Sequence, residues 1–367
     1  MILNPISQLV NQKIKLDPVF VKAYENIQSN HIKRISLLGD LLIDKYVYGN
    51  IIPSSENGLF TFYAESETEY PGGAGFVANI LNDISQNKFD FYFKWNESNN
   101  SNEHDIIDYL KEYCQWINVH ILKDPNFPNI NVKTRYLKNN SEQLFRIDTH
   151  NINDSKLVNN KWIPFNAHNK QIRFANSDLI IISDYNKGFV DIDIMNQVID
   201  SKIPFIVDGK SDNFKFYHNA FMIFPNDDEY KLINQQIYNN SQNIKIKCVV
   251  HKKHQFGIEL ELFENDHVYK HNILVPKQFK EYNVNVCGAG DIILAITSYL
   301  LPRNLEDLDI TDLLLILNVA VYCASYFVTI KPTIDLDYVV LINEAFKFYA
   351  TDGLDLYKDS LIRHYEL

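Results

Sequence analysis

The sequence has few cysteines, and none of them stands in a pattern that binds a metal or builds a disulfide framework. Cys114, Cys248, Cys287 and Cys323 are scattered along the chain and form no CxxC pair. No stretch approaches the ~18 consecutive apolar residues of a membrane span. The N-terminus also lacks the long apolar core of a signal peptide. These absences favour a soluble, cytoplasmic protein without a zinc site or disulfides.

Positive charge is also in deficit. Lysine and arginine number 35 against 46 aspartates and glutamates, so the formal net charge is −11. A chain this acidic is unsuited to wrapping nucleic acid, although a local group of cations could still bind a phosphorylated small molecule. Hydrophobic residues make up 46% of the 367 residues, which is enough for a sizeable core. Length alone allows about two domains.

Short apolar runs alternate with helical stretches along much of the chain. The strand-like runs are residues 34–39, 178–183, 203–208, 221–224 and 246–250. The polar clusters that follow such runs are residues 39–44, 184–188, 208–210 and 225–229. This alternation predicts an α/β fold with a mostly parallel sheet and helices on both faces. Because ligands bind beyond the carboxyl ends of such strands, the clusters are expected to converge on one site.

Two segments differ from the rest of the chain in their hydrophobic pattern. Residues 51–70 and 130–148 contain alternating, β-rich patches, which we interpret as a small β lid inserted into the main domain. Residues 1–30 are predicted to be a polar, weakly helical N-terminal extension, and residues 341–367 a C-terminal helical tail. One domain over residues 31–340 then accounts for most of the chain.

The sharpest motif is Gly288-Ala289-Gly290-Asp291, which opens an apolar helical stretch that stops at Pro302. A turn of small residues at a helix start leaves backbone N–H groups unpaired, and the helix dipole adds about half a positive charge there. Such a turn could stabilise a transferring phosphoryl group while Asp291 accepts the proton of an attacking hydroxyl. An ordinary N-cap aspartate explains the segment about equally well. The sequence has no GxxxxGK[ST], which excludes a P-loop enzyme.

These motifs resemble those of PfkB-type (ribokinase-like) carbohydrate kinases, and they occur in that family's order. The Gly-Ala-Gly-Asp segment resembles the family's second signature. Residues 39–49 resemble its opening strand and sugar loop, 71–74 its di-glycine sugar motif, 225–229 its Asn-x-x-Glu motif and 317–320 the helix start that borders the nucleotide. The resemblance implies a three-layer ribokinase-like sandwich that uses ATP and Mg²⁺, with Asp291 as catalytic base and the amides of residues 288–290 as the anion hole.

Within this family, the likeness is closest to the heptose 7-phosphate 1-kinases of lipopolysaccharide-precursor synthesis. It rests on residues 133–135, 143–148, 183–188 and 207–210. The resemblance implies phosphorylation of heptose 7-phosphate at its anomeric hydroxyl, giving heptose 1,7-bisphosphate. Two alternatives stay open: a PfkB-type kinase for another sugar or a nucleoside, and a catalytically silent protein that binds a sugar phosphate or nucleotide. We see no second apolar-periodic block for a fused nucleotidyltransferase.

Carboxylates suit sugar hydroxyls, and cations suit a phosphate. Asp44 could accept two hydrogen bonds from the sugar, and Gly72 and Gly73 would let the backbone approach it closely; simple turn roles explain these three residues as well. The cations in the resembling segments are Lys133, Arg135, Arg146, Lys187 and Lys210. Each alone is typical of a solvated surface charge, but together two or three are predicted to bind the substrate phosphate.

Asn226 and Glu229 are predicted to organise Mg²⁺ and phosphate. Mg²⁺ keeps several of its waters, so they would act through water rather than as direct ligands. An Asn followed three residues later by Glu is also typical of a capping box. For the nucleotide, the resemblance implies Asn226 and Asn318. Gly257 could flank it too, although a loop glycine explains that residue equally well.

Three residues depart from the family pattern. Asn285 and Cys287 stand where the family usually has Asp and Thr beside a monovalent cation, so the resemblance does not carry that cation over to this chain. Phe76 stands where the family supplies an Asn to the sugar, and a phenyl ring cannot make that hydrogen bond. The expected partners are a sugar phosphate, ATP and a second copy bound through the β lid, with neither nucleic acid nor membrane.

Overall fold

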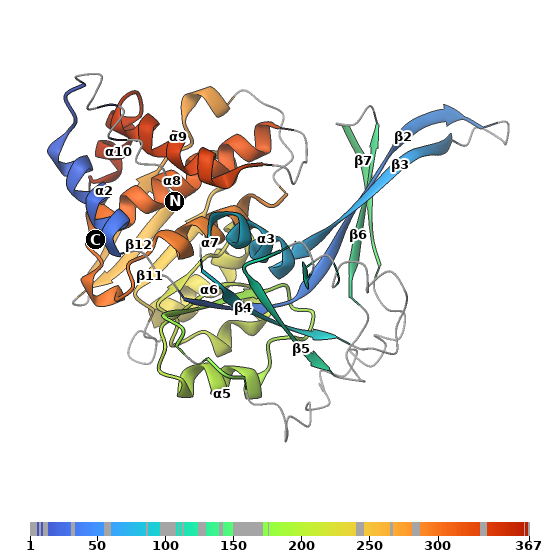
Figure 1. Cartoon of the computed structure of the whole chain (residues 1–367), viewed down its shortest axis with the longest axis horizontal. Coiled ribbons are helices and arrows are strands. Elements are labelled where there is room, and N and C mark those ends of the chain that lie inside the picture. The colour runs from blue at the N-terminus through green and yellow to red at the C-terminus, as the bar shows by residue number, and fades with distance from the viewer. Residues whose placement is uncertain are drawn as a thin grey trace.

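A large sheet runs through the molecule and carries most of its core (Figure 1). The computed structural model describes residues 14–30, 34–54, 60–85, 87–95, 114–123, 130–138, 142–149, 172–174, 176–239, 246–264, 267–280, 287–330, 336–362 and 364–365, with the single residues 6, 9, 108, 110 and 111. Within them, the strands of the sheet are β1 Ile35–Gly39, β4 Phe89–Trp95, β5 Ile117–Lys123, β8 Leu179–Asp184, β9 Phe205–Gly209, β10 Met222–Ile223, β11 Cys248–Lys252, β12 Ile258–Glu264, β13 His267–Ile273 and β14 His364–Tyr365.

The sheet is parallel over most of its width. Its order is β14-β13-β12-β11-β10-β9-β8-β1-β4-β5. All neighbours from β11 to β5 pair in parallel, and β12, β13 and β14 continue the sheet in antiparallel pairing. Every residue of β1 and β8 is buried, as expected for central parallel strands covered on both faces. The predicted α/β class with a mostly parallel sheet is therefore confirmed.

Helices cover both faces of this sheet (Figure 1). On one face lie α3 Ala74–Ile84, α7 Ala289–Leu300 and α8 Ile310–Thr329, with α9 Tyr338–Ala350 packed against α8. On the other face lie α5 Ile192–Asp200 and α6 Asp227–Asn239. The sheet and its two helical layers make a three-layer sandwich, in which each polar cluster follows a strand at the carboxyl edge of the sheet.

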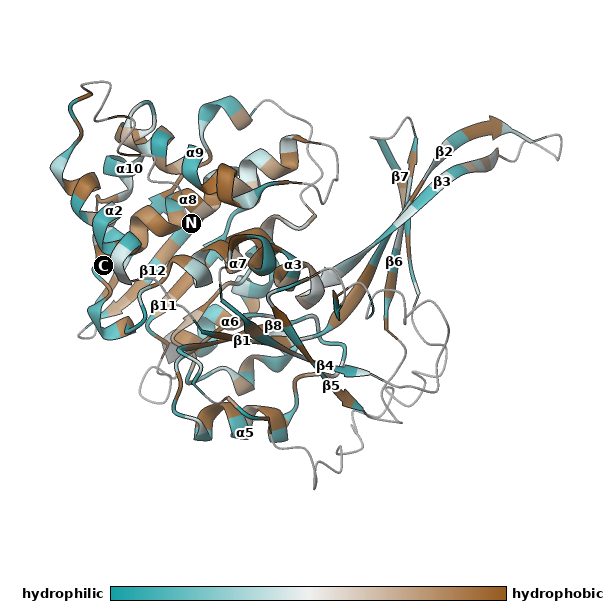
Figure 2. Ribbon diagram, viewed as in Figure 1, coloured by the Kyte–Doolittle hydropathy of each residue, from teal (hydrophilic) through white to brown (hydrophobic). Residues whose placement is uncertain are grey.

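The helix α8 corrects one expectation from the sequence. It has 20 residues and is long and apolar enough to cross a membrane by length and composition, so the prediction that no stretch approaches a membrane span is wrong. However, 72% of its most apolar window is buried inside the molecule. It packs between α7 and α9, and its apolar surface forms part of the core (Figure 2). Hydropathy alone does not separate a membrane span from such a core helix.

A second, four-stranded sheet projects from the main body as an arm (Figure 1). Its strands are β2 Leu41–Pro53, β3 Phe60–Gly73, β6 Val132–Lys138 and β7 Glu142–Asp148, in the order β3-β2-β6-β7. The hairpin of β2 and β3 pairs from Leu41↔Gly73 outward to Pro53↔Phe60. It begins directly after β1, so the arm is continuous with the carboxyl edge of the main sheet and carries its side chains to that edge.

The two ends of the described chain pack together. Helix α2, Pro18–Asn30, buries Phe20 and Tyr24 among the C-terminal helices. The ring centroid of Tyr24 lies 5.1 Å from that of Phe346 in α9, and that of Phe20 lies 6.1 Å from that of Tyr357 in α10, Leu354–Ser360. Residues 18–30 are thus a packed helix, which the polar composition of residues 1–30 did not indicate.

Candidate active site

Asp40 joins the polar clusters that follow β1 and β8. This buried carboxylate lies directly after β1 and accepts hydrogen bonds from the backbone N–H groups of Tyr185 (2.9 Å), Lys187 (3.0 Å) and Phe189 (3.0 Å). Burial, followed by the nearby Asp184 carboxylate, raises the pKa of Asp40 to about 7. Asp40 therefore fixes the loop after β8 against the end of β1, as expected if the clusters form one site.

The start of α7 lies against the same loop. Gly288, which precedes the helix, has a φ of 83°, a left-handed conformation that favours glycine. Asp291 is buried in the first turn, and its Oδ1 accepts a hydrogen bond from the Tyr185 hydroxyl at 2.7 Å. Burial and then the Asp208 carboxylate raise the pKa of Asp291 to about 7, against the opposing hydrogen bond from Tyr185. A carboxyl group with this pKa is suited to taking up a proton near neutral pH.

The backbone at this helix start has the geometry of an anion site. The first hydrogen bond of the helix runs from the Ile292 N–H to the Gly288 carbonyl at 3.0 Å. The N–H groups of Ala289 and Gly290 precede it and have no acceptor within the helix. Together with the positive end of the helix dipole, they favour a bound anion directly beside Asp291. Their role as an anion hole stays a prediction.

A charged pair that the sequence motifs did not single out lies beside this turn. Lys252, the last residue of β11, places its Nζ 2.6 Å from Asp208 Oδ2 at the end of β9. A Cβ placed on Gly290 would lie 3.2 Å from that Nζ. The sequence does contain one signal for Lys252: it closely follows the strand-like run 246–250, which places it near the carboxyl edge of the sheet. Tyr185 lies within the motif of residues 183–188, but the motif predicts no role for this side chain.

The arm brings the predicted sugar-binding residues to the same edge. Asp44 on β2 places its Oδ1 2.5 Å from Arg135 Nη1 on β6. A Cβ on Gly72 would lie only 2.1 Å from Asp44 Oδ2, so this close approach requires glycine. Lys133 Nζ lies 4.6 Å from the centroid of the Tyr185 ring. Burial lowers the pKa of Lys133, against the opposing effect of nearby carboxylates that include Asp44.

Two further glycines and an arginine have structural roles in the described chain. Gly73, with a φ of 58°, ends β3 and precedes α3. Gly257, with a φ of 97°, forms the turn before β12, where a Cβ would lie 2.1 Å from the Ile273 carbonyl oxygen. Arg146 lies on β7 and pairs with Asp148 of the same strand, Nε to Oδ1 at 2.8 Å. Arg146 is therefore engaged within the arm.

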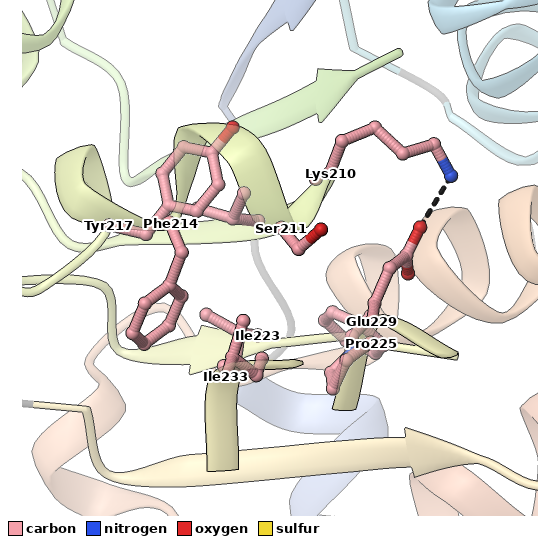
Figure 3. A pocket seen from close by; sticks show the side chains of 11 residues that line it. Lys210, Ser211, Phe214, Tyr217, Ile223, Pro225, Glu229 and Ile233 are labelled. Atoms are coloured by element: carbon pink, nitrogen blue, oxygen red, sulfur yellow. Dashed lines mark hydrogen bonds and ion pairs between the residues drawn. The ribbon is translucent and has the colours of Figure 1, made fainter. Parts of the chain in front are cut away.

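Lys210 and Glu229 meet at one side of a pocket beyond β9 (Figure 3). Lys210 Nζ lies 2.5 Å from Glu229 Oε1. Glu229 Oε2 accepts a hydrogen bond from the Asn226 N–H at 2.9 Å, and Asn226 Oδ1 accepts one from the Glu229 N–H at 2.9 Å. This reciprocal pair is the capping box that the spacing allowed. Lys187, the remaining predicted cation, is half-buried on the loop that Asp40 fixes.

The prediction for Asn318 is wrong. Helix α8 does not begin at residues 317–320 but at Ile310, where Asp309 caps it through a hydrogen bond from the Thr311 N–H. Asn318 lies in the middle of α8 and is fully buried, and its Nδ2 donates to Ser360 Oγ of α10 at 3.0 Å. The apolar sequence on both sides of Asn318 keeps the helix continuous, so its amide ties two helices together and is closed to a nucleotide.

Phe76 lies against the helix start. Its ring centroid is 5.7 Å from that of Phe327, and a Cβ on Gly288 would lie 2.8 Å from Phe76 Cε1. The two rings therefore back the turn that precedes α7. Cys287 is half-buried, whereas Asn285 lies outside the described residues. Among the residues that the structure describes, no group of three His, Cys, Asp or Glu side chains could hold a metal ion.

Solved structures share this architecture. A ribokinase from Giardia lamblia superposes with a TM-score of 0.59 at 13% identity, covering 86% of this chain and 99% of the other. The chain has the ribokinase fold. An Arabidopsis thaliana ribokinase, complexed with ribose and ATP, gives a TM-score of 0.56 at 16% identity, covering 86% and 99%. Phosphofructokinase-2 from Escherichia coli gives 0.57 at 14% identity, with the same coverage.

Comparison of sequences gives a second, independent likeness for this ribokinase-fold chain. The bifunctional protein HldE of Koribacter versatilis is 26% identical over 302 residues, covering 76% of this chain and 58% of the relative. HldE of a Nitratiruptor species is 27% identical over 279 residues, covering 74% and 57%. The chain thus spans little more than half the length of the curated relatives it matches. No protein-family model matches it.

Proposed function

We propose that the chain is an ATP-dependent sugar kinase. The observation that carries the proposal is the buried carboxyl of Asp291 in the first turn of α7. It lies beside the N–H groups of the helix start and is hydrogen-bonded to Tyr185, on the loop after β8 at the carboxyl edge of the sheet. A base next to an anion site is the minimum that phosphoryl transfer to a hydroxyl needs. The ribokinase fold and the likeness to HldE proteins support the same reading.

In the proposed reaction, Asp291 takes the proton of the sugar hydroxyl. Its Oδ1 is held by Tyr185, which leaves Oδ2 for the substrate. The hydroxyl oxygen then forms a bond to the γ-phosphorus of ATP as the bond to the ADP oxygen breaks. The N–H groups of Gly288, Ala289 and Gly290 stabilise the negative charge on the transferring group.

The substrate we propose is heptose 7-phosphate, phosphorylated at its anomeric hydroxyl to give heptose 1,7-bisphosphate. This substrate is supported by the motifs that resemble heptose 7-phosphate 1-kinases and by the 26% identity with the bifunctional protein HldE of Koribacter versatilis. In this chain, Asp44 is suited to the sugar hydroxyls, whereas Lys133 and Arg135 are suited to the substrate phosphate. Arg146 is the weakest of the proposed phosphate contacts, because its guanidinium is paired on the arm.

The residues fit a magnesium ion held through water. The capping box occupies Asn226 Oδ1, and Lys210 occupies one oxygen of Glu229, so direct coordination would first break these contacts. Bound Mg²⁺ would supply charge neutralisation at the nucleotide phosphates, with Asn226 and Glu229 orienting its waters. Gly257 remains a proposed neighbour of the nucleotide. The cytoplasmic location expected of an ATP-dependent enzyme belongs to the same proposal.

Phe76 favours a second candidate, a kinase for another sugar or a nucleoside. Its ring packs on Phe327 beside Gly288, and a site wall of this kind gives no hydrogen bond to a hydroxyl. A substrate without a hydroxyl next to the Phe76 ring would therefore fit better than one whose hydroxyl is left there without a hydrogen-bond partner.

We also propose a homodimer that forms through the arm. Its exposed apolar side chains are Ile51, Ile52, Phe60, Tyr63, Phe145 and Ile147. Phe60 alone is 73% exposed. Such a group on a projecting sheet is typical of a surface that a partner covers.

The test is ADP formation by the purified chain with ATP, Mg²⁺ and a panel of heptose, hexose and pentose phosphates, free sugars and nucleosides. Preference for heptose 7-phosphate supports the main proposal, and turnover of another member supports the second candidate. ATP binding without ADP formation from any of them would instead indicate a silent binding protein.

A further inference from the structure

Lys252 connects two of the polar segments that follow strands to the start of α7. Its backbone N–H donates to the Pro225 carbonyl at 2.8 Å, and its backbone pairs with Asn226 at the start of α6. Its side chain reaches Asp208 Oδ2 at 2.6 Å, beyond β9. The aliphatic chain and ammonium also lie over Gly290, 3.7 Å and 3.2 Å from the position that a Cβ would take there.

This ion pair is a poor candidate for a purely structural role. The side chains of Lys252 and Asp208 are 16% and 17% exposed, so an entering ligand can reach both. Lys252 puts a positive charge beside the N–H groups of the helix start, and Asp208, whose Oδ2 lies 3.6 Å from the same Cβ position on Gly290, balances that charge until an anion replaces it. Lys252 also opposes the burial effect on the pKa of Asp291, which places its charge within range of the base.

We propose that Lys252 binds the transferring phosphoryl group at the start of α7 and exchanges Asp208 for that anion when the nucleotide arrives. The inference rests on the proposed kinase function. Asp208 keeps the ammonium in place before the anion enters, and a phosphate with two negative charges competes well for it. The exchange makes and breaks no covalent bond: Lys252 only changes its partner from Asp208 to the phosphoryl oxygens.

The neighbouring lysine provides a matched control. Lys253 pairs instead with Glu259 on β12, its Nζ 2.6 Å from Oε2. The variants Lys252→Met and Lys253→Met therefore remove the same charge one residue apart. Asp208→Asn is the decisive third variant, because it breaks the same ion pair as Lys252→Met but leaves the cation.

The first experiment measures binding of inorganic tripolyphosphate by titration calorimetry, with a thermal melt of each variant as a check on folding. Lys252→Met should weaken binding about tenfold or more, and Asp208→Asn should strengthen it several-fold, since the freed ammonium no longer has to leave a carboxylate. Lys253→Met should bind like the wild type. Equal weakening by Lys252→Met and Asp208→Asn would mean that the pair only holds the structure, and the proposal would be overturned.

The second experiment measures ADP formation with the preferred sugar. Lys252→Met should lower kcat by roughly 10²–10³, the usual loss on removing one group that stabilises transferring charge, with the KM for the sugar changed less than about threefold. Lys252→Arg should restore part of the rate. An active wild type with an equally active Lys252→Met variant overturns this inference and leaves the kinase standing. No ADP from the wild type, with the calorimetric pattern intact, overturns the kinase and leaves Lys252 as an anion-binding residue.

Discussion

Asp291→Asn is expected to lower kinase activity and, at the same time, to stabilise the fold at alkaline pH. Asparagine has the same shape, and its side-chain oxygen can still accept the Tyr185 hydrogen bond that Asp291 Oδ1 accepts at 2.7 Å. Only the proton-accepting charge is lost. Removal of a general base costs about 10²–10⁴ in kcat, so activity should fall by that factor with little change in structure.

The effect on stability follows from the raised pKa. Burial raises the pKa of Asp291 from 3.8 to about 7 in the folded chain. A carboxyl group with a raised folded pKa stabilises the fold fully below its unfolded pKa, and this contribution is lost as the pH rises through about 7. At about pH 8 the ionised group costs at most about 4 kcal/mol of the free energy of unfolding. The neutral asparagine would carry no such cost, so the variant should melt higher than the wild type at about pH 8 and nearly level with it at about pH 4.

Calorimetric melts at about pH 4, 6 and 8, together with ADP formation at about pH 8, test both halves. Asp228→Asn is the control, because its carboxylate is exposed in the first turn of α6 and should change neither quantity. Activity of Asp291→Asn within about threefold of the wild type would refute its role as the base. A melting temperature below that of the wild type at the alkaline end would refute the burial cost.

Three further changes test other parts of the site. Tyr185→Phe removes a hydrogen bond that lowers the pKa of Asp291, so the acidic limb of the profile of kcat/KM against pH should move about 1 pH unit higher; an unchanged limb would separate Tyr185 from the base. Gly72→Ala places a Cβ 2.1 Å from Asp44 Oδ2 and should raise the KM for the sugar about tenfold while leaving the KM for ATP unchanged. If the variant and the wild type have the same KM for the sugar, Asp44 does not bind the sugar. Tyr63→Asp puts a charge among the exposed apolar side chains of the arm and should give monomers in sedimentation velocity, whereas an unshifted dimer would exclude Tyr63 from the interface.

The parts of the fold that the sequence predicts well are those in which one segment carries its own signal. The strands β1 and β8 are fully buried, so they are continuous apolar runs, and each ends in an acidic turn. The Gly-Ala-Gly-Asp turn is recognisable because Gly288 must adopt a left-handed conformation and the helix after it is apolar. The capping box of Asn226 and Glu229 was similarly visible in their spacing.

The missed features all depend on a partner that is distant in the sequence. Asn318 looked like the start of a helix, but its amide bonds Ser360, 42 residues away. Helix α2 looked polar, yet its apolar side chains complete a core made with α9 and α10. Nothing in the sequence around Lys252 distinguishes it from other lysines, and only the fold places it between Asp208 and Gly290. The local sequence pattern does not predict these contacts, because each forms only when the layers of the fold pack together.

The paired state of the site's cations bears on how so acidic a chain would select the phosphorylated substrate that we propose. Arg135 is held by Asp44, Lys210 by Glu229 and Lys252 by Asp208. An entering phosphate must therefore compete with a carboxylate that already satisfies the cation. A group with two charges and several acceptor oxygens can outcompete a carboxylate, whereas a singly charged carboxylate metabolite gains nothing by the exchange. In the reaction we propose, the released Asp44 would accept hydrogen bonds from the sugar hydroxyls, and the released Glu229 would accept them from the waters of a bound Mg²⁺. On this argument the net charge of −11 is compatible with phosphate binding, because the acidic partners reject weaker anions and hold each cation in position until the substrate arrives.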